Sequence, residues 1–226
     1  MAEMQKMAGM KQMVHVYAAD IRNLPDPLEA PRVMDGLSEE RKKKIVRYKQ
    51  PDGRRQSLGA GLLLRQALAR HGMQETEVYI GKNGKPEVKG ICFNLSHSHN
   101  IVVCAIGEKP VGCDVEKEES SAKEKVAERF FCDTEIAYLK DKKEEFFRFW
   151  TMKESYVKMT GEGLRLPLNQ FEIRFEERVK IYRDGKTCAC FLKEYEIPGY
   201  RLTVCSEESE FVPRLEYILL ANNGGS

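Results

Sequence analysis

The sequence predicts an α+β fold in which the order strand, helices, strands is followed by a second round of helices and strands. Apolar residues alternate with a period of two in some segments and recur at helical spacing in others, and segments of each kind are grouped along the chain. A turn-like stretch at residues 107–110 separates the two rounds. A chain of 226 residues has room for one large domain or two small ones.

The first round begins with one strand and two helices. Alternating apolar residues from Val14 to Ala18 predict the strand. After a loop with three prolines, Ser38 is placed to cap a basic helix that reaches about residue 48, because its hydroxyl can accept a backbone N–H of the first turn. A second helix, with leucines at helical spacing, covers about residues 54–71 and ends at a glycine.

The remaining elements follow from the same two periodicities. Short strands are expected at residues 78–80, 91–95, 101–106 and 111–115. Helical spacing returns at residues 122–131, 134–141 and 144–160. Further strands are expected at residues 171–175, 179–182, 188–195 and 202–205, with a hairpin turn at residues 183–186. We therefore expect two units, residues 1–108 and 109–226.

Composition excludes several classes of protein. With 42% hydrophobic and 32% charged residues, the chain can form a core, and it is not a disordered, collagen-like or coiled-coil protein. Its 37 Lys plus Arg against 35 Asp plus Glu give no global basic field, so nucleic acid is not an expected partner. No apolar run approaches the roughly 20 residues of a membrane span, and no signal peptide is visible. An odd number of cysteines without a C-x-x-C pair predicts reduced thiols in a cytoplasmic protein.

The first candidate for chemistry is the segment Gly112-Cys113-Asp114-Val115-Glu116. On a strand, Asp114 and Glu116 project from the same face while their neighbours point to the other. Two adjacent carboxylates repel each other unless a cation lies between them, and hard oxygen ligands suit Mg²⁺. The alternative is a solvated strand end whose acidic residues keep the edge soluble. On spacing alone both interpretations remain open.

The second candidate is the helical segment from Trp150 to Lys158. Glu154 and Lys158 are four residues apart and share a face with Trp150, whereas Lys153 is turned by about 100° and could reach a neighbouring group. Glu154 could supply a third carboxylate to a Mg²⁺ site, and the lysines could meet phosphate oxygens. The alternative is an ordinary surface Glu–Lys pair, which periodicity alone favours.

Two further segments offer contacts to phosphate. A strand that ends in Ser96-His97-Ser98 presents hydroxyls, backbone N–H groups and an imidazole. A catalytic serine is rejected because Ser96 and His97 point to opposite faces of the strand, and zinc is rejected because the spacings match no ligand pattern. In the basic helix, Arg41 and Lys44 share one side and could bind a terminal phosphate; the alternative is a solvated face.

In this order and spacing, these segments resemble the Sfp-type 4′-phosphopantetheinyl transferases. The matching segments are Gly84-Lys85-Pro86, Phe93-Asn94-Leu95-Ser96-His97-Ser98, Gly112-Cys113-Asp114-Val115-Glu116, Trp150-Thr151-Met152-Lys153-Glu154-Ser155-Tyr156-Val157-Lys158 and Gly161-Glu162-Gly163-Leu164. The Asp-x-Glu and Trp-x-x-Lys-Glu-x-x-x-Lys motifs are highly specific as a pair, and the resemblance covers about residues 14–205. Two positions depart from the family pattern: Cys113 stands where Ile or Val is usual, and Arg41 where Lys is more common.

The resemblance implies a monomer of two similar α+β halves related by a pseudo-twofold axis, each an antiparallel sheet packed with helices, with the active site at the seam. It implies transfer of the phosphopantetheine arm of coenzyme A to a serine of an apo acyl or peptidyl carrier protein, releasing adenosine 3′,5′-bisphosphate. Asp114, Glu116 and Glu154 would bind Mg²⁺, with Mn²⁺ a possible substitute. The implied coenzyme A contacts are Lys85 and Pro86 at the adenine, Arg41, Lys44, Ser57, Ser96 and His97 at the phosphates, and Lys153 and Lys158 completing the phosphate shell.

Physical principles then suggest roles for two residues. Glu154 is expected to be the general base, directly or through a bound water, and Lys158 to stabilise or protonate the departing phosphate. Two other classes stay open: an Mg²⁺-dependent phosphohydrolase acting on coenzyme A or a nucleotide, and a coenzyme A-binding module without catalysis. Because a binder needs no base, the presence of both residues favours the transferase. The carrier and its pathway, whether for fatty acids, polyketides or nonribosomal peptides, stay open.

Overall fold

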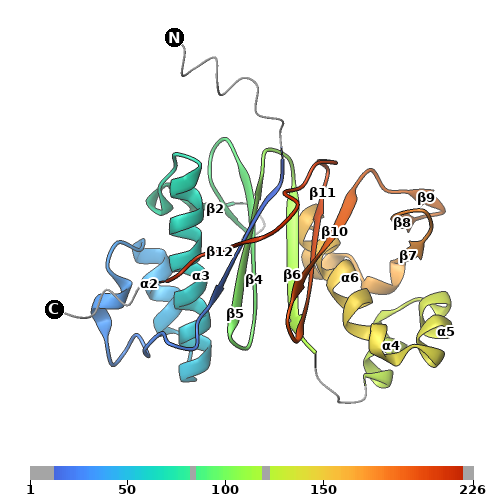
Figure 1. The fold of residues 1–226 in the computed structure, drawn as a ribbon, viewed down its shortest axis with the longest axis horizontal. Coiled ribbons are helices and arrows are strands. Elements are labelled where there is room, and N and C mark those ends of the chain that lie inside the picture. The colour runs from blue at the N-terminus through green and yellow to red at the C-terminus, as the bar shows by residue number, and fades with distance from the viewer. Residues whose placement is uncertain (1–12, 82–84, 119–122, 221–226) are drawn as a thin grey trace, which may run out of the picture.

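The computed structural model describes residues 13–81, 85–118 and 123–220. Helices and sheets form four layers in the order α, β, β, α (Figure 1). The helices are α2 (Glu39–Val46), α3 (Pro51–Arg70), α4 (Glu124–Phe130), α5 (Asp133–Asp141) and α6 (Phe146–Thr160). Helix α3 covers the outer face of one sheet and α6 that of the other, while the inner faces of the sheets pack together. The α+β fold class is confirmed, and the pseudo-twofold relation of the halves stays a prediction.

The N-terminal sheet has the strand order β12–β1–β5–β4. Its strands are β1 (His15–Asp20), β4 (Cys92–Ser98), β5 (Ile101–Gly107) and the short β12 (Glu216–Tyr217). The pairs β1–β5 and β5–β4 are antiparallel, whereas β12 joins β1 in parallel. Strand β5 is buried along its whole length, which explains its unbroken apolar sequence. The turn between β4 and β5 passes through His99 in the left-handed conformation, with φ of 49°.

Helices α2 and α3 bury an aliphatic core against this sheet. The Ser38 hydroxyl accepts the Arg41 N–H and caps α2, as predicted. Helix α3 begins three residues earlier than expected, at Pro51, because a proline in the first turn has no N–H that would need a partner. A side chain at Gly59 would lie 2.4 Å from Ile21, so this glycine lets α3 approach the sheet closely.

The C-terminal sheet has the order β10–β11–β6, and all its pairs are antiparallel. Its strands are β6 (Val111–Lys117), β10 (Phe191–Ile197) and β11 (Tyr200–Ser206), and α6 packs on β6 and β11. A second small sheet consists of β7 (Phe171–Phe175), β8 (Val179–Arg183) and β9 (Lys186–Thr187). The predicted hairpin is confirmed: Asp184 and Gly185 both have positive φ, 52° and 73°, which suits a two-residue turn.

The end of the described chain returns to the N-terminal half. Strand β12 pairs with β1, and the Ile218 N–H donates to the Ala18 carbonyl at 2.8 Å (Figure 1, red segment). Upstream, Val14 donates to the carbonyl of Glu210 and accepts the N–H of Val212. Residues 207–220 therefore tie the two halves together, and the boundary between residues 108 and 109 stays a prediction.

Most expected elements are present, with shifted ends. The strand expected at residues 188–195 begins at Phe191, because the Cys190 N–H bonds the Cys188 carbonyl in a tight turn. Short strands β2 (Tyr79–Ile80) and β3 (Pro86–Glu87) flank a segment outside the described residues, which includes Gly84. All seven cysteines lie in the described ranges and are free thiols. Within those ranges, no helix combines the length and apolar character that crossing a bilayer requires.

Candidate active site

The two sheets meet where β4 of the N-terminal half runs beside β6 of the C-terminal half. Helix α6 lies directly against β6 because Gly112 has no side chain: a Cβ there would be 2.1 Å from the Ser155 carbonyl oxygen and 2.4 Å from the Met159 nitrogen. No rotamer change relieves a clash with backbone, so only glycine permits this approach. The contact places Glu154 and Lys158 of α6 over the β6 residues Asp114 and Glu116.

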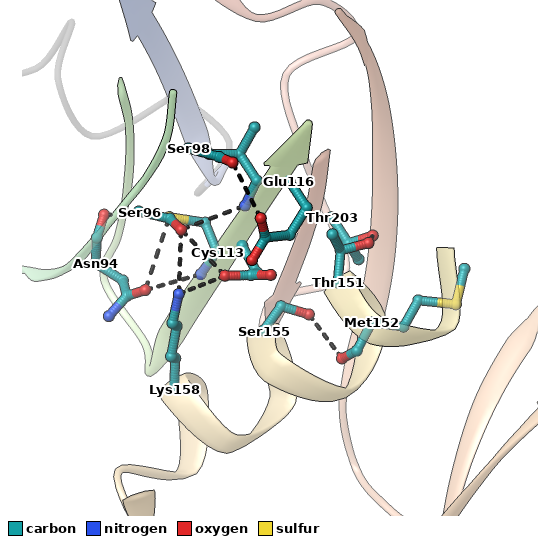
Figure 2. Close-up of polar contacts among 12 residues, drawn as sticks. Asn94, Ser96, Ser98, Cys113, Glu116, Thr151, Met152, Ser155, Lys158 and Thr203 are labelled. Carbon is teal, nitrogen blue, oxygen red and sulfur yellow. Dashed lines mark hydrogen bonds and ion pairs between the residues drawn. The ribbon is translucent and has the colours of Figure 1, made fainter. Parts of the chain in front are cut away.

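The contact of β4 in the N-terminal half with β6 and α6 in the C-terminal half is called the seam below. Lys158 and Asp114 form its central ion pair. The Lys158 Nζ donates to Asp114 Oδ1 at 2.5 Å and to the Ser96 hydroxyl at 3.1 Å (Figure 2). Ser96 in turn donates to the same Asp114 oxygen at 3.1 Å. Burial alone would lower the pKa of Lys158, but the Asp114 carboxylate outweighs this and raises it. Lys158 is therefore positively charged at neutral pH.

Two further carboxylates, Glu116 and Glu154, lie within electrostatic reach of Asp114. Burial, followed by the negative charge of Asp114, raises the pKa of Glu116 and also that of Glu154. The second oxygen of Asp114, Oδ2, is buried and has no hydrogen-bond partner among the described residues. A carboxylate oxygen in that state calls for a ligand, since its burial carries a desolvation cost.

The donor set therefore fits a hard divalent cation, with the orphaned oxygen of Asp114 as the strongest indication. Within the described residues, no three potential ligands are grouped closely enough to hold a metal ion as they stand. Lys158 occupies the position beside Asp114 Oδ1. The assignment of Asp114, Glu116 and Glu154 as metal ligands stays a prediction.

The N-terminal half contributes basic side chains to the same region. Desolvation lowers the pKa of His97, and the charges of Lys158 and Lys44 lower it further, which places all three groups within electrostatic reach of one another. Desolvation, followed by the charge of Arg41, lowers the pKa of Lys44. The structure thus brings together three of the predicted phosphate contacts, from α2 and β4, with Lys158 from α6.

Ser57 on α3 supplies a further polar group without a partner. Its hydroxyl is buried and makes no hydrogen bond to any described residue. Gly61, one helical turn along, faces Arg41: a Cβ there would lie 3.0 Å from the Arg41 side chain. Ser57 therefore lies on the side of α3 that turns toward the basic residues of α2.

A cavity of about 680 Å³ opens beside Glu154 and Lys158. Its polar lining includes Lys85, Asn94, Glu154 and Lys158. Lys85 donates through Nζ to the Lys158 carbonyl at 3.1 Å, and burial lowers its pKa. The rest of the lining is largely apolar and includes Phe130, Trp150, Val157, Leu164, Leu166 and Leu168, with Arg129 among them. Pro86, the other predicted adenine contact, comes directly after Lys85 and is the first residue of β3.

Lys153 is not at the phosphate site, and this prediction is wrong. Its side chain is completely buried, pairs with Glu135 of α5 at 2.8 Å, and donates to the carbonyl oxygens of Leu168 and Phe171. All its donors are used within the C-terminal half. The turn of about 100° between adjacent helical residues points Lys153 away from the seam that Glu154 faces.

The hydroxyl of Ser96, another predicted phosphate contact, is used in hydrogen bonds within the protein. It is buried, donates to Asp114, and accepts from Lys158 and from the Val115 N–H at 3.3 Å. These contacts leave the Ser96 hydroxyl no proton for a phosphate oxygen. They indicate instead that Ser96 positions Asp114 and Lys158. Sequence reasoning also missed two residues of the same strand face, Asn94 and Ser98, although the period of two in Asn94-x-Ser96-x-Ser98 was a usable signal.

Comparisons with known proteins agree with this geometry. A family model described as the 4′-phosphopantetheinyl transferase superfamily matches residues 110–205, which include β6 and α6. The chain is 34% identical over 198 residues to 4′-phosphopantetheinyl transferase Sfp of Bacillus subtilis, covering 81% of this chain and 88% of that protein. It is 36% identical over 181 residues to the 4′-phosphopantetheinyl transferase gsp of Aneurinibacillus migulanus, covering 75% and 76%.

The α+β fold and these relatives define the class of protein as a group-transfer enzyme. The chain belongs to the 4′-phosphopantetheinyl transferase family. The resemblance found from the sequence motifs is therefore confirmed.

Proposed function

We propose that this chain transfers the 4′-phosphopantetheine arm of coenzyme A to a serine hydroxyl of an apo acyl or peptidyl carrier protein, releasing adenosine 3′,5′-bisphosphate. The observation that carries the proposal is the charge arrangement of the seam. Lys158 lies within electrostatic reach of three carboxylates of its own half and of His97 from the other half, which is also close to Lys44. Glu154 and Lys158 line a cavity of about 680 Å³, large enough for a substrate arm. A substrate with phosphates at both ends of a ribose needs such separate cationic and metal-binding groups.

The proposed division of labour follows the two halves. The 3′-phosphate is bound by Arg41, Lys44, His97 and the hydroxyl of Ser57, while Lys85 and Pro86 border the adenine. Asp114, Glu116 and Glu154 hold Mg²⁺ or Mn²⁺, which supplies charge neutralisation at the pyrophosphate when bound. Lys158 neutralises charge on the departing phosphate, because the Asp114 carboxylate raises its pKa against the opposing effect of burial and so keeps it protonated.

Glu154 is the proposed general base. Its raised pKa brings the carboxyl closer to the range in which proton transfer at neutral pH is efficient. It lines the cavity, and the carrier serine approaches from that open side. In chemical terms, the serine oxygen forms a bond to the phosphorus, the pyrophosphate bridge breaks, the serine proton passes to Glu154, and the leaving phosphate takes the electron pair.

The remaining parts of the proposal are the assembly and its place in the cell. We propose a cytoplasmic monomer of two pseudo-twofold halves, residues 1–108 and 109–226, that contains its complete site within one chain. A phosphohydrolase built on the same carboxylates would cleave coenzyme A with no carrier present, which gives the two activities separate products.

Intact-mass spectrometry tests the reaction directly. An apo carrier incubated with this protein, coenzyme A and Mg²⁺ is expected to gain the mass of one phosphopantetheine arm, and EDTA is expected to abolish the gain. Glu154→Gln should lose turnover while it still binds coenzyme A. Unmodified carriers together with cleaved coenzyme A would instead establish the hydrolase, and full turnover of Glu154→Gln would exclude Glu154 as the base.

A further inference from the structure

The two halves are joined along β4 and β6 by side chains in place of a backbone ladder. Asn94, Ser96 and Ser98 alternate along β4 and face the edge of β6. Asn94 Oδ1 accepts the Cys113 N–H at 2.9 Å, and the hydroxyl of Ser98 accepts the Lys117 N–H at 3.1 Å. The Ser96 hydroxyl accepts the Val115 N–H between them. Each of these contacts, the rungs of the seam, satisfies one N–H of an otherwise open strand edge.

Two of the three rungs also contact a carboxylate of β6. The Ser98 hydroxyl accepts from Lys117 and donates to Glu116 Oε2 at 3.0 Å (Figure 2). Ser96 repeats this arrangement with Asp114. Each serine therefore donates to a carboxylate of β6 and accepts the backbone N–H of the residue that comes directly after that Asp or Glu. The Asn94 rung is different, because its partner Cys113 carries no carboxylate.

We propose that Ser98 is a positioning residue that orients the Glu116 carboxylate for cation binding across the seam. The inference rests on the proposed function, in which Glu116 is a metal ligand. Ser98 is buried, its hydroxyl has a single proton, and the shortest acceptor for that proton is Glu116, with His99 Nδ1 farther away at 3.4 Å. A hydroxyl held by a backbone N–H of the opposite half fixes the carboxylate more firmly than water does.

The arrangement also couples cation binding to the docking of the halves. Ser98 belongs to the N-terminal half and Glu116 to the C-terminal half, so the carboxylate is oriented only when β4 and β6 are together. A cation that binds only when the two halves are docked adds its binding free energy to the stability of the docked form. The seam therefore serves both as a structural joint and as an outer shell for the metal ligands.

The test measures binding of Mn²⁺ itself, with saturating coenzyme A, from the electron paramagnetic resonance of the free ion. Ser98→Ala is expected to weaken Mn²⁺ binding about tenfold, the usual effect of losing an outer-shell partner. Ser98→Thr keeps the hydroxyl and is expected to restore the affinity. Tyr195→Phe is the control: it removes the hydrogen bond from Tyr195 to the Val212 carbonyl at 2.8 Å, which joins β10 to the returning segment away from the carboxylates and the cavity. It should lower the urea midpoint and leave Mn²⁺ affinity at the wild-type value.

Two results would overturn the proposal. One is wild-type Mn²⁺ affinity in Ser98→Ala; the other is an equal loss in Ser98→Ala and Tyr195→Phe, which would assign the effect to a general loss of contact between the halves. The comparison of urea midpoints shows whether each variant is folded. If Ser98→Ala fails to fold, Ser98→Cys keeps the shape with a weaker donor and is expected to give an intermediate affinity. Absence of Mn²⁺ binding by the wild-type protein would refute the metal site itself and is recognised without any variant.

Discussion

The two sides of helix α6 carry lysines that form similar ion pairs in different surroundings. On the outer side, Lys153 pairs with Glu135 inside an aromatic core, and both partners belong to the C-terminal half. On the seam side, Lys158 pairs with Asp114 at 2.5 Å, is 29% exposed, and also contacts Ser96 of the N-terminal half. One pair is sealed within a half, whereas the other borders a cavity.

This difference separates stability from function along a single helix. The contacts of Lys153 are complete in the protein alone, including two backbone carbonyls and the rings of Phe131 and Phe171. The contacts around Lys158 are incomplete, because Asp114 Oδ2 has no partner among the described residues. We therefore expect substitutions on the outer side to change the free energy of unfolding, and those on the seam side to change binding or turnover.

The largest expected effect is on the outer side. Lys153→Met removes one partner of a fully buried pair and leaves Glu135 uncompensated, which typically lowers the free energy of unfolding by about 3–5 kcal/mol. Urea unfolding measures this loss, and turnover per folded molecule should stay close to the wild-type value. Adding Glu135→Gln removes the stranded charge, keeps an oxygen for the Ile173 N–H, and should recover part of the stability. A stable Lys153→Met with low turnover would break the comparison.

The next effect is on the seam side. Lys158→Ala removes the cation proposed to neutralise the leaving phosphate and should lower kcat about 10²–10³-fold. The protein should remain folded, because a buried carboxyl such as Asp114 can take up a proton when its counter-charge is removed. Carrier mass gain over time gives kcat, and urea unfolding gives the folded fraction. A variant that loses stability but keeps kcat would place Lys158 with Lys153 as a structural lysine.

The contrast between the two lysines also shows how far the sequence could be read. Local periodicity predicted α6 and its neighbours within a few residues, because amphipathic spacing and turn residues are local properties. The motif around Trp150 treated Lys153 and Lys158 alike, as phosphate contacts. Their separation depends on Glu135, which lies 18 positions upstream of Lys153 and reaches it only through packing of α5 against α6. No local pattern contains that information.

The seam was predictable only in part for the same reason. The Asp-x-Glu spacing placed Asp114 and Glu116 on one face of a strand, and the structure agrees. That β4 lies beside β6, with Ser98 on Glu116, depends on how two sheets pack. Gly112 looked like an ordinary motif glycine, although the backbone of α6 passes where its Cβ would be. Side-chain periodicity gave the right face of each strand, but it does not show which strands meet.

A smaller effect is expected at Ser57, on the N-terminal side of the seam. A hydroxyl bonded to a phosphate contributes about 1.5–3 kcal/mol, so Ser57→Ala should raise the KM for coenzyme A about tenfold or more. The KM for dephospho-coenzyme A, which lacks the 3′-phosphate, should not change. Because the hydroxyl has no hydrogen-bond partner among residues 13–81, 85–118 and 123–220, its removal should not lower the urea midpoint. Equal increases in KM for both substrates would show that Ser57 does not contact the 3′-phosphate.

The smallest expected effect is a pH dependence at His97. Desolvation and the charges of Lys158 and Lys44 lower the pKa of its imidazole below the ordinary value, so the free enzyme holds it neutral at about pH 7. A bound 3′-phosphate favours the imidazolium and raises that pKa, so coenzyme A binding takes up a proton. Affinity should therefore increase as the pH falls toward about 6, and this slope should be absent with dephospho-coenzyme A and in His97→Gln. Calorimetric titrations at several pH values measure the slope; the same slope for both ligands would show that the proton is taken up elsewhere in the seam.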